Sequence, residues 1–422
     1  MGIRFNLPTI MQQAIPVLEK LGEQGYEAVF VGGCVRDTVM GLSIKDVDIA
    51  TSARPEQVLA LFPRCIPTGL QHGTVTVLHN GIPYEVTTYR TESEYEKHRR
   101  PAQVEFIDRL DGDLLRRDLT INAMAMYADG ELYDPFQGIE DLRHKVIRCV
   151  GDADARFQED ALRMLRTIRF ASQFGFSIAH QTWRALIKHR ELLQFIAMER
   201  VFAELDRMVS GAAPQHALHL LSVSRLLLYC GTPLAAADKL GEAYLANPDS
   251  FKPFTQIHKL QHPDMRYAAM LMVDYLTTIE ADETLKALRL PTARVNSIMA
   301  VLHMHSQLIM KQDEDLRLTW TNAVIQYGET AARGWLSIAQ WDPHQVLHPY
   351  ANLFMEWLDN MPALNLKQLK LNGKQLAGGL NQEPGTWMGR MLQRLLLQVA
   401  LGKLPNEQEA LLAQAQIWNI ED

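Results

Sequence analysis

The chain has 422 residues, of which 47% are hydrophobic and 22% are charged, and its formal net charge is −7. This length favours several domains, and the composition excludes intrinsically disordered and fibrous proteins. No apolar run approaches the ~18 residues of a membrane span, and four widely spaced cysteines fit a reducing cytoplasm better than a disulfide framework.

Residues 26–90 have the pattern of a small α/β domain. The run YEAVFVG predicts a strand that ends at Gly32-Gly33, VRDTVMG predicts a helix, and DVDIAT predicts a second strand. RPEQVLALF predicts a short helix with a proline in its first turn. TVTVLHNGIPYEVTTYR predicts two strands joined at Asn80-Gly81, a dipeptide that favours the tight turn of a β-hairpin.

From about Arg109 onward the chain is predicted to be helical. Apolar residues recur at helical intervals in EDALRMLRTIRFASQFGF, QTWRALIKHRELLQFI, ERVFAELDRMVSG, QHALHLLSVSRLLLY and ADETLKALRL. Residues 143–207 hold 12 Lys or Arg and 8 Asp or Glu, so this stretch can follow a phosphate backbone although the whole chain is acidic. We expect the α+β class, with an α/β head and a long helical remainder.

Two carboxylates, Asp46 and Asp48, stand two residues apart on the second predicted strand and so project from the same face. They repel one another unless a cation lies between them, and Mg²⁺ prefers carboxylate oxygens together with substrate phosphates. The Gly32-Gly33 turn lets backbone N–H groups approach an anion, and Arg36 lies one turn into the next helix. A solvated strand end with an ordinary turn and a surface arginine is the alternative. The combination favours a site for a nucleoside triphosphate and Mg²⁺.

Two further segments add polar side chains. In YEVTTYR, Glu85 is either a third carboxylate beside the aspartates or an exposed residue of the sheet edge. In LLRRDLTINAMAM, Arg116, Arg117 and Asp118 precede an apolar run that is interpreted as a helix, and Asp118 is in place to cap it.

The segment EDALRMLRTIRF is interpreted as one amphipathic helix. Its charged face carries Glu159, Arg163 and Arg166, with Asp160 and Arg169 on the flanks. A solvated face with Glu–Arg pairs is the ordinary explanation. Three arginines and two carboxylates without a lysine also suit planar hydrogen bonding to a nucleotide base, because Asp accepts from exocyclic amines and Arg donates to ring and carbonyl acceptors.

These stretches, as an ordered set, resemble the class II (bacterial) tRNA nucleotidyltransferases, the CCA-adding enzymes, within the polymerase-β-like superfamily. The resemblance rests on GGCVRD, KDVDIATSARPEQV, HGTVTVLHNGIPYEVTTYR, RRDLTINAMAM, DPFQGIEDL, EDALRMLRTIRFASQFGF and ERVFAEL, which span the first half of the chain. LKLNGKQL is similar to the C-terminal region of the Gram-positive type. Residues 215–340 match only as helical.

The resemblance implies a domain order. A polymerase-β-like α/β nucleotidyltransferase head would occupy residues 1–150, and a helical neck that recognises the base would occupy residues 151–212. A helical body over residues 213–340 and a helical tail over residues 341–422 would follow, and the tail would bind tRNA. The oligomeric state is left open, with a homodimer as one alternative.

The resemblance also implies the roles of individual residues. Asp46 and Asp48 would be the catalytic residues and would bind two Mg²⁺ ions. Gly33 and Arg36 would contact the triphosphate, and Arg117 would also bind the nucleotide.

The base would be recognised on the other side of the site. Asp160 and Arg163 would read the edge of the base as a protein template, Arg166 and Arg169 would complete the pocket, and Asp118 would lie near the ribose. The implied reaction is in-line attack by the tRNA 3′-hydroxyl on the α-phosphate of CTP or ATP, which releases pyrophosphate.

Three alternatives remain on the same scaffold. Bacterial poly(A) polymerases typically carry a basic C-terminal extension, whereas residues 351–422 hold 6 Lys or Arg and 7 Asp or Glu. CC-adding enzymes lack a flexible loop after the hairpin, whereas TESEYEKHRRPAQVEF fills that place here. A catalytically inactive RNA-binding relative would have substituted aspartates, and these are intact. The complete CCA-adding activity is therefore favoured.

Overall fold

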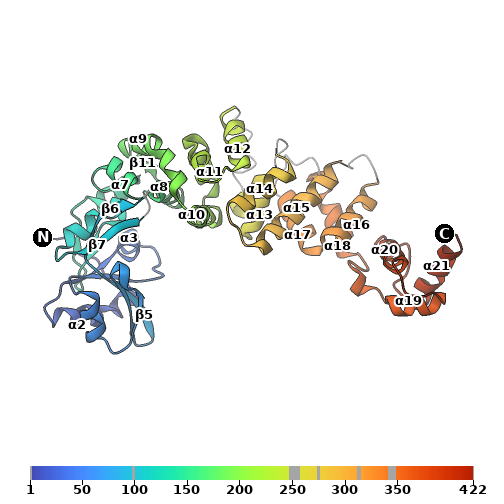
Figure 1. The fold of residues 1–422 in the computed structure, drawn as a ribbon, viewed down its shortest axis with the longest axis horizontal. Helices are drawn as coiled ribbons and strands as arrows, with labels where there is room; N and C mark the ends of the chain where they lie inside the picture. Colours follow the sequence, from blue (N-terminus) through green and yellow to red (C-terminus); the bar gives the residue numbers. More distant parts are fainter. Residues whose placement is uncertain are drawn as a thin grey trace. The chain divides into compact units, whose positions relative to one another are not determined.

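The computed structural model describes residues 2–96, 100–246, 257–272, 276–310, 315–340 and 348–421. The chain divides into two compact units, Met1–Pro233 and Leu234–Asp422. The first unit holds a mixed sheet and helices, and the described part of the second is helical, which confirms the α+β class (Figure 1). The division into head, neck, body and tail at residues 150, 212 and 340 is finer and stays a prediction.

The first unit is built on a seven-stranded sheet with strand order β3-β4-β5-β2-β1-β8-β9. The strands are β1 (Ala28–Val31), β2 (Asp48–Thr51), β3 (Cys65–Gly69), β4 (Thr74–His79), β5 (Ile82–Thr88), β8 (Ala125–Met126) and β9 (Leu132–Tyr133). All neighbouring strands are antiparallel except β2 and β5, which run parallel. The turn between β4 and β5 has Asn80 at φ 51° and Gly81 at φ 80°, which confirms the predicted hairpin.

Helices surround this sheet and continue beyond it. They are α1 (Thr9–Gln12), α2 (Ile15–Gly22), α3 (Gly33–Met40), α4 (Pro55–Leu61), α5 (Leu110–Leu115), α6 (Gly138–His144), α7 (Ala153–Glu159), α8 (Leu162–Phe174), α9 (His180–His189), α10 (Met198–Ser210) and α11 (Pro214–Ser224). The predicted helices after the first and second strands are confirmed as α3 and α4. A buried cluster that includes Val29, Val31, Ala50 and Leu114 packs the sheet against α5.

The interpretation of EDALRMLRTIRF as one helix is wrong. Helix α7 ends at Glu159, Asp160 is extended at φ −135°, and α8 begins at Leu162. Oδ1 of Asp160 accepts a hydrogen bond from the backbone N–H of Leu162 at 3.0 Å. An aspartate that bonds the backbone two residues onward favours a turn, and this turn competes with a continuous helix.

Two other predictions need correction. The apolar run after Asp118 is a short 3-10 helix, Thr120–Asn122, followed by strand β8, so Asp118 caps no α-helix there. The segment predicted as a loop after the hairpin contains the paired strands β6 (Arg90–Glu96) and β7 (Arg100–Phe106). Residues 97–99 of that segment lie outside the described residues. In β8 and in β6–β7 the backbone forms hydrogen bonds with a neighbouring strand. The spacing of apolar residues along the sequence does not indicate such pairing.

One remaining strand pair and the helices of the second unit complete the described elements. In the first unit β10 (Val146–Ile147) pairs in parallel with β11 (Ser177–Ile178). The second unit contains α12 (Ala235–Ala246), α13 (Pro263–Leu271), α14 (Thr278–Ala287), α15 (Thr292–Met310), α16 (Leu316–Tyr327), α17 (Glu329–Ala339), α18 (Ala351–Asp359), α19 (Gly373–Leu380), α20 (Trp387–Ala400) and α21 (Gln408–Glu421). No helix within the described residues has the length and apolar character to cross a membrane.

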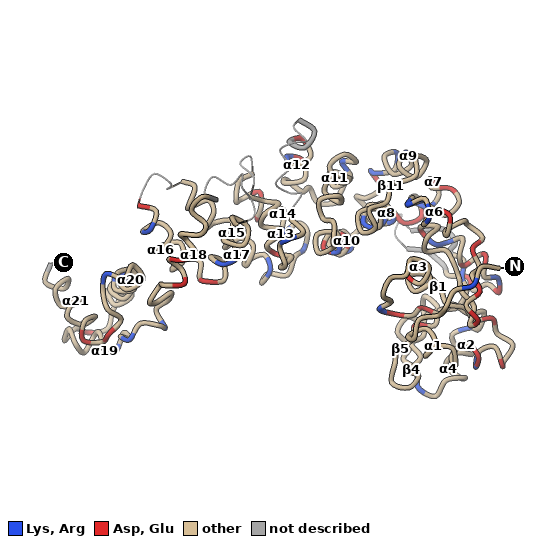
Figure 2. The backbone as a smooth tube through the Cα atoms, turned by 180° about the vertical axis from the view of Figure 1, so that it is seen from behind, with Lys and Arg blue, Asp and Glu red and all other residues tan. Residues whose placement is uncertain are grey.

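The helices of the second unit are held by aromatic and aliphatic packing. Trp320 stacks on Phe354 with ring centroids 4.7 Å apart, and Trp335 packs beside both at 5.7 and 5.8 Å. A second buried cluster, with Leu371, Leu376 and Leu395 among its members, joins α19, α20 and α21. Figure 2 shows basic and acidic residues interspersed along these last helices, in keeping with the absence of a basic tail that the sequence indicated.

Candidate active site

One cavity of about 570 Å³ in the first unit brings together every site residue that the sequence predicted. The predicted residues that line it are Gly33, Arg36, Asp46, Asp48, Arg117, Asp160, Arg163, Arg166 and Arg169. They come from α3, the start of β2, the segment after α5, and the α7–α8 turn with α8 itself. Segments that lie far apart in the sequence therefore converge on one place.

The carboxylate pair lies where β2 begins, but Asp46 precedes the strand and is exposed, so the prediction that both aspartates stand on it is wrong for Asp46. Asp48 is the first residue of β2 and is the register partner of Glu85 on the parallel strand β5, so the two side chains share a face of the sheet. Burial raises the pKa of Asp48 to about 6, and the charges of Asp46 and Glu85 add to this, while Arg117 opposes it. The strand edge therefore holds an excess of negative charge that a cation would relieve.

This donor set suits Mg²⁺ better than a transition metal. Within the described part of the chain, no group of three His, Cys, Asp or Glu side chains is arranged to hold a metal ion. Two carboxylates together with substrate phosphates and water are the ligands that Mg²⁺ usually takes in proteins. Glu85 is exposed and does not line the cavity, so its place beside Asp48 is established and a role as third ligand stays a prediction.

The glycine turn and Arg36 form the wall beside the carboxylates. Gly32 has φ 72°, and a Cβ at this position would lie 3.3 Å from Nη1 of Arg117 and 3.6 Å from Oδ2 of Asp48. Arg36 is buried, its Nη1 donates to Oδ1 of Asn122 at 2.6 Å, and its guanidinium lies 5.0 Å from the ring centre of Phe174. Arg36 is therefore not a surface arginine, and binding of an anion at the glycine turn stays a prediction.

Arg117 is oriented by a buried carboxylate that the sequence did not suggest. Asp113 on α5 is fully buried and accepts from Nε and Nη2 of Arg116 at 2.9 and 2.7 Å and from Nη2 of Arg117 at 3.0 Å. Burial alone would raise the pKa of Asp113, but the two guanidinium groups hold it below its usual value. Nε of Arg117 is buried and has no hydrogen-bond partner among the described residues. Asp113 precedes Arg116 by three residues and Arg117 by four, a spacing that favours ion pairs on a helix and could have indicated this role.

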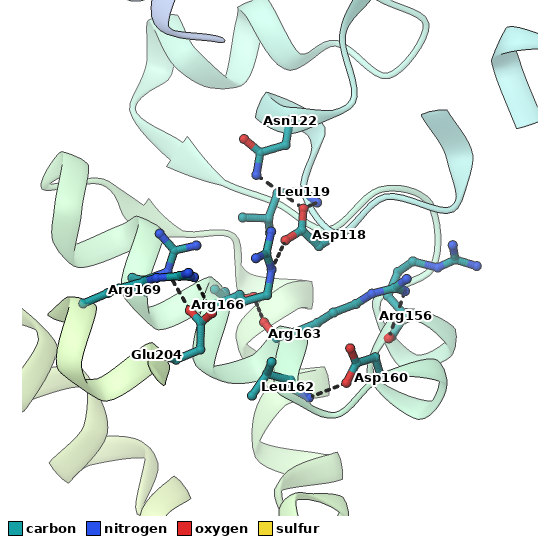
Figure 3. A network of polar contacts seen from close by, with 12 residues as sticks. Asp118, Leu119, Asn122, Arg156, Asp160, Leu162, Arg163, Arg166, Arg169 and Glu204 are labelled. Carbon is teal, nitrogen blue, oxygen red and sulfur yellow. Dashed lines mark hydrogen bonds and ion pairs between the residues drawn. The ribbon is translucent and has the colours of Figure 1, made fainter. Parts of the chain in front are cut away.

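Asp118 joins the two sides of the cavity (Figure 3). Its Oδ2 accepts from Nε of Arg166 at 2.6 Å, and its Oδ1 accepts from the backbone N–H of Leu119 and from Nδ2 of Asn122. Asp118 and Asn122 belong to the segment before β8, whereas Arg166 belongs to α8. This ion pair fixes α8 against the sheet domain.

Asp118 is expected to make the folded state sensitive to acid. Burial alone would raise the pKa of Asp118, but the charge and hydrogen bond of Arg166 outweigh it and lower the pKa from 3.8 to about 2. A carboxyl whose pKa is lower in the folded state stabilises the fold above the unfolded pKa and loses that contribution as the pH falls through the folded value. The shift corresponds to about 2 kcal/mol of unfolding free energy.

Denaturant unfolding of the wild type and of Asp118→Asn at pH 7 and pH 3 measures this contribution. The wild type should lose more unfolding free energy than the variant between the two pH values. An equal loss in both proteins would contradict the assignment.

The arginines of α8 face the cavity rather than bulk solvent. Arg163 is buried, pairs with Glu159, and its Nη2 donates to the carbonyl of Arg116 at 2.8 Å. Nε of Arg169 donates to Oε2 of Glu204 at 2.6 Å, and its guanidinium lies 4.0 Å from the ring centre of Phe170. The predicted pairing of Glu159 with Arg163 is confirmed, although the two residues lie on different helices.

Three comparisons with known proteins show the family of the chain. Residues 28–148 match the family described as Poly A polymerase head domain, residues 175–230 match "Probable RNA and SrmB- binding site of polymerase A", and residues 259–415 match "tRNA nucleotidyltransferase domain 2 putative". The CCA-adding enzyme of Latilactobacillus sakei is 40% identical over 96% of this chain and 97% of its own length. That of Levilactobacillus brevis is 38% identical over 97% and 98%. The chain belongs to the CCA-adding enzyme family.

A solved structure supports the same assignment. The Bacillus stearothermophilus CCA-adding enzyme in complex with CTP is 32% identical, with a TM-score of 0.80 and coverage of 98% of each chain. The Thermotoga maritima CCA-adding enzyme complexed with tRNA is 20% identical with a TM-score of 0.68, which shows a shared fold. The resemblance found in the sequence is confirmed, and this member of the family is a nucleotidyltransferase of a class that generally depends on divalent metal ions.

Proposed function

We propose that this tRNA nucleotidyltransferase builds the CCA end of tRNA in the cavity described above. It adds C, C and A stepwise to the 3′ end, takes them from CTP and ATP without a nucleic-acid template, releases pyrophosphate, and acts in the cytoplasm. The observation that carries the assignment is the convergence of all nine predicted residues on one cavity of about 570 Å³ in a chain of the CCA-adding family.

The first part of the proposal concerns the phosphates. Asp46 and Asp48 would hold Mg²⁺, because they are adjacent carboxylates whose mutual repulsion a cation relieves. Bound there, Mg²⁺ would supply charge neutralisation at the phosphates and favour deprotonation of the attacking hydroxyl. The backbone of Gly33 at the start of α3, the guanidinium of Arg36 and the unpartnered Nε of Arg117 would bind the triphosphate oxygens.

The second part of the proposal concerns the nucleoside. Asp160 would accept from the exocyclic amine that cytosine and adenine share, and Arg163 would donate to the neighbouring ring acceptor. Arg166 and Arg169 would close the pocket, and Asp118 would lie near the ribose. Glu159 holds Arg163 and Glu204 holds Arg169, so these arginines are already oriented before a ligand enters.

The segment that contains the paired strands β6 and β7 is expected to act in the last addition step. Deletion within SEYEKHRRP, residues 93–101, should leave addition of the two C residues near the wild-type rate and reduce addition of the terminal A by about tenfold or more, because a loop at this place is what resembles CCA-adding rather than CC-adding enzymes. The measurement is single-turnover extension of transcripts that need C or only A. Equal loss of all three steps would make the segment structural.

Poly(A) synthesis is the competing activity on this scaffold. A tail without a basic excess gives little means of holding arbitrary RNA, whereas a tRNA can be selected by its shape. The protein should therefore extend tRNA lacking its 3′ end and ignore an unstructured RNA of equal length at the same ATP concentration. Comparable extension of the unstructured RNA would favour the poly(A) polymerase alternative.

A further inference from the structure

Arg200 belongs to the stretch ERVFAEL and reaches the cavity from α10, although the sequence predicted no role in the site for it. Its Nη2 donates to Oδ2 of Asp160 at 2.9 Å, and 34% of its side chain is exposed. It lines the cavity together with the predicted residues. The contact joins helix α10 to the turn between α7 and α8, two segments that are 40 residues apart in the chain.

The two oxygens of Asp160 are held by different parts of the chain. Oδ1 accepts from the backbone N–H of Leu162 within its own turn, and Oδ2 accepts from Arg200. The terminal torsion of an aspartate is broad, so a single hydrogen bond does not fix the plane of the carboxylate. Because both oxygens accept a hydrogen bond, the plane of the Asp160 carboxylate is fixed. The lone pairs that remain free on these oxygens then point in a fixed direction.

Helix α10 contributes a second contact of the same kind. Glu204 is one turn beyond Arg200 on the same face of α10 and accepts from Nε of Arg169 at 2.6 Å. On this face of α10, Arg200 binds Asp160 of the α7–α8 turn. Glu204 binds Arg169 of α8. The face of α10 is therefore complementary in charge to the cavity wall that it supports.

We propose that Arg200 is a positioning residue for base selection. It holds the carboxylate of Asp160 in the plane from which the free lone pairs meet the exocyclic amine of cytosine or adenine. This proposal rests on the proposed reading of the base by Asp160 and adds the residue that orients it. Without Arg200 the carboxylate keeps its charge but rotates, and hydrogen bonds weaken steeply with misalignment. Selectivity between bases should therefore suffer more than binding of the triphosphate.

Replacement of Arg200 by methionine and by lysine tests this. Arg200→Met should narrow the preference for CTP over UTP, and for ATP over GTP, by about tenfold, the size expected when one charge-assisted hydrogen bond is lost. Arg200→Lys keeps a cationic donor and should restore part of the preference. The measurement is single-nucleotide incorporation into tRNA with all four triphosphates, alongside tRNA affinity and melting temperature.

Two further variants make the test specific. Arg184→Met removes an exposed arginine of α9 and should leave selectivity unchanged. The double variant Asp160→Ala/Arg200→Met should be no less selective than Asp160→Ala alone, because Arg200 acts through Asp160. If Arg200→Met does not fold, Arg200→Gln and Arg200→Lys carry the comparison.

Two results would overturn the proposal. One is a lower rate of nucleotide incorporation by Arg200→Met with unchanged selectivity between bases. The other is a loss of selectivity in Asp160→Ala/Arg200→Met that equals the sum of the losses in the two single variants. Failure of the proposed function itself is seen separately, because the wild type would then show no preference for CTP and ATP.

Discussion

Alanine in place of Asp48, or of Asp46, is expected to abolish addition of both C and A while the protein stays folded. The substitution removes half of the carboxylate pair at the start of β2, where burial of Asp48 and the negative charges of its neighbours favour a bound cation. A metal ion contributes several kcal/mol to transfer of a nucleotidyl group, so the rate should fall by about a thousandfold or more. Single-turnover incorporation of labelled CMP and AMP into tRNA measures it.

A matched carboxylate in the same unit serves as the control. Asp129 pairs with Arg4 at 2.9 Å on the surface, with 51% of its side chain exposed, and Asp129→Ala should leave incorporation unchanged. A second readout is the rise in melting temperature that CTP and Mg²⁺ produce together, which should disappear in the Asp46 and Asp48 variants. Near-normal incorporation by either folded variant would remove the pair from the mechanism.

Asp160→Ala is expected to lower the use of CTP and ATP and to narrow their advantage over UTP and GTP. UTP and GTP present a carbonyl where the amine should be, so two acceptors face each other and the free lone pair of the Asp160 carboxylate finds no donor. A mismatch of this kind costs ~1–3 kcal/mol or more for a charged group, which corresponds to roughly tenfold to a few hundredfold discrimination. Incorporation of each of the four triphosphates by wild type and variant gives the ratio.

Arg163→Ala complements that experiment. Arg163 contacts Glu159 and the backbone of Arg116 inside the cavity, so its loss should weaken addition of C and A with little effect on tRNA affinity. Unchanged selectivity in both variants would mean that the residues stabilise α8 and do not read the base.

The sequence predicted the strands β1, β2, β4 and β5 and nine residues of the cavity because their signals are local, whereas β3, β8 and β9 were missed. Asn80-Gly81 predicts a tight turn, and the alternation around Asp48 predicts a strand. The break at Asp160 was missed because the apolar periodicity of EDALRMLRTIRF continues through it. The turn depends on one side chain-to-backbone hydrogen bond from Leu162, and periodicity does not register such a bond.

Residues that support the site from behind were harder to find. Asp113 contacts the two arginines but stands in an unremarkable acidic stretch, DGDLL. Arg200 and Glu204 act on residues 40 and 35 positions away, and only the packing of α10 against α8 brings them there. The pattern of a single sequence does not show which distant residues form pairs. It does show the aspartates, arginines and glycines that line the cavity.

Extension of three tRNA transcripts tests whether this protein adds C, C and A in order. The transcripts end before the first C, after the first C and after the second C, and each is incubated with Mg²⁺ and with CTP, ATP or both. We expect CTP alone to complete CC and stop, ATP alone to add one A only to the transcript that ends in CC, and the mixture to give CCA on all three. A run of several A residues, or failure to extend the CC transcript with ATP, would contradict the assignment as a CCA-adding enzyme.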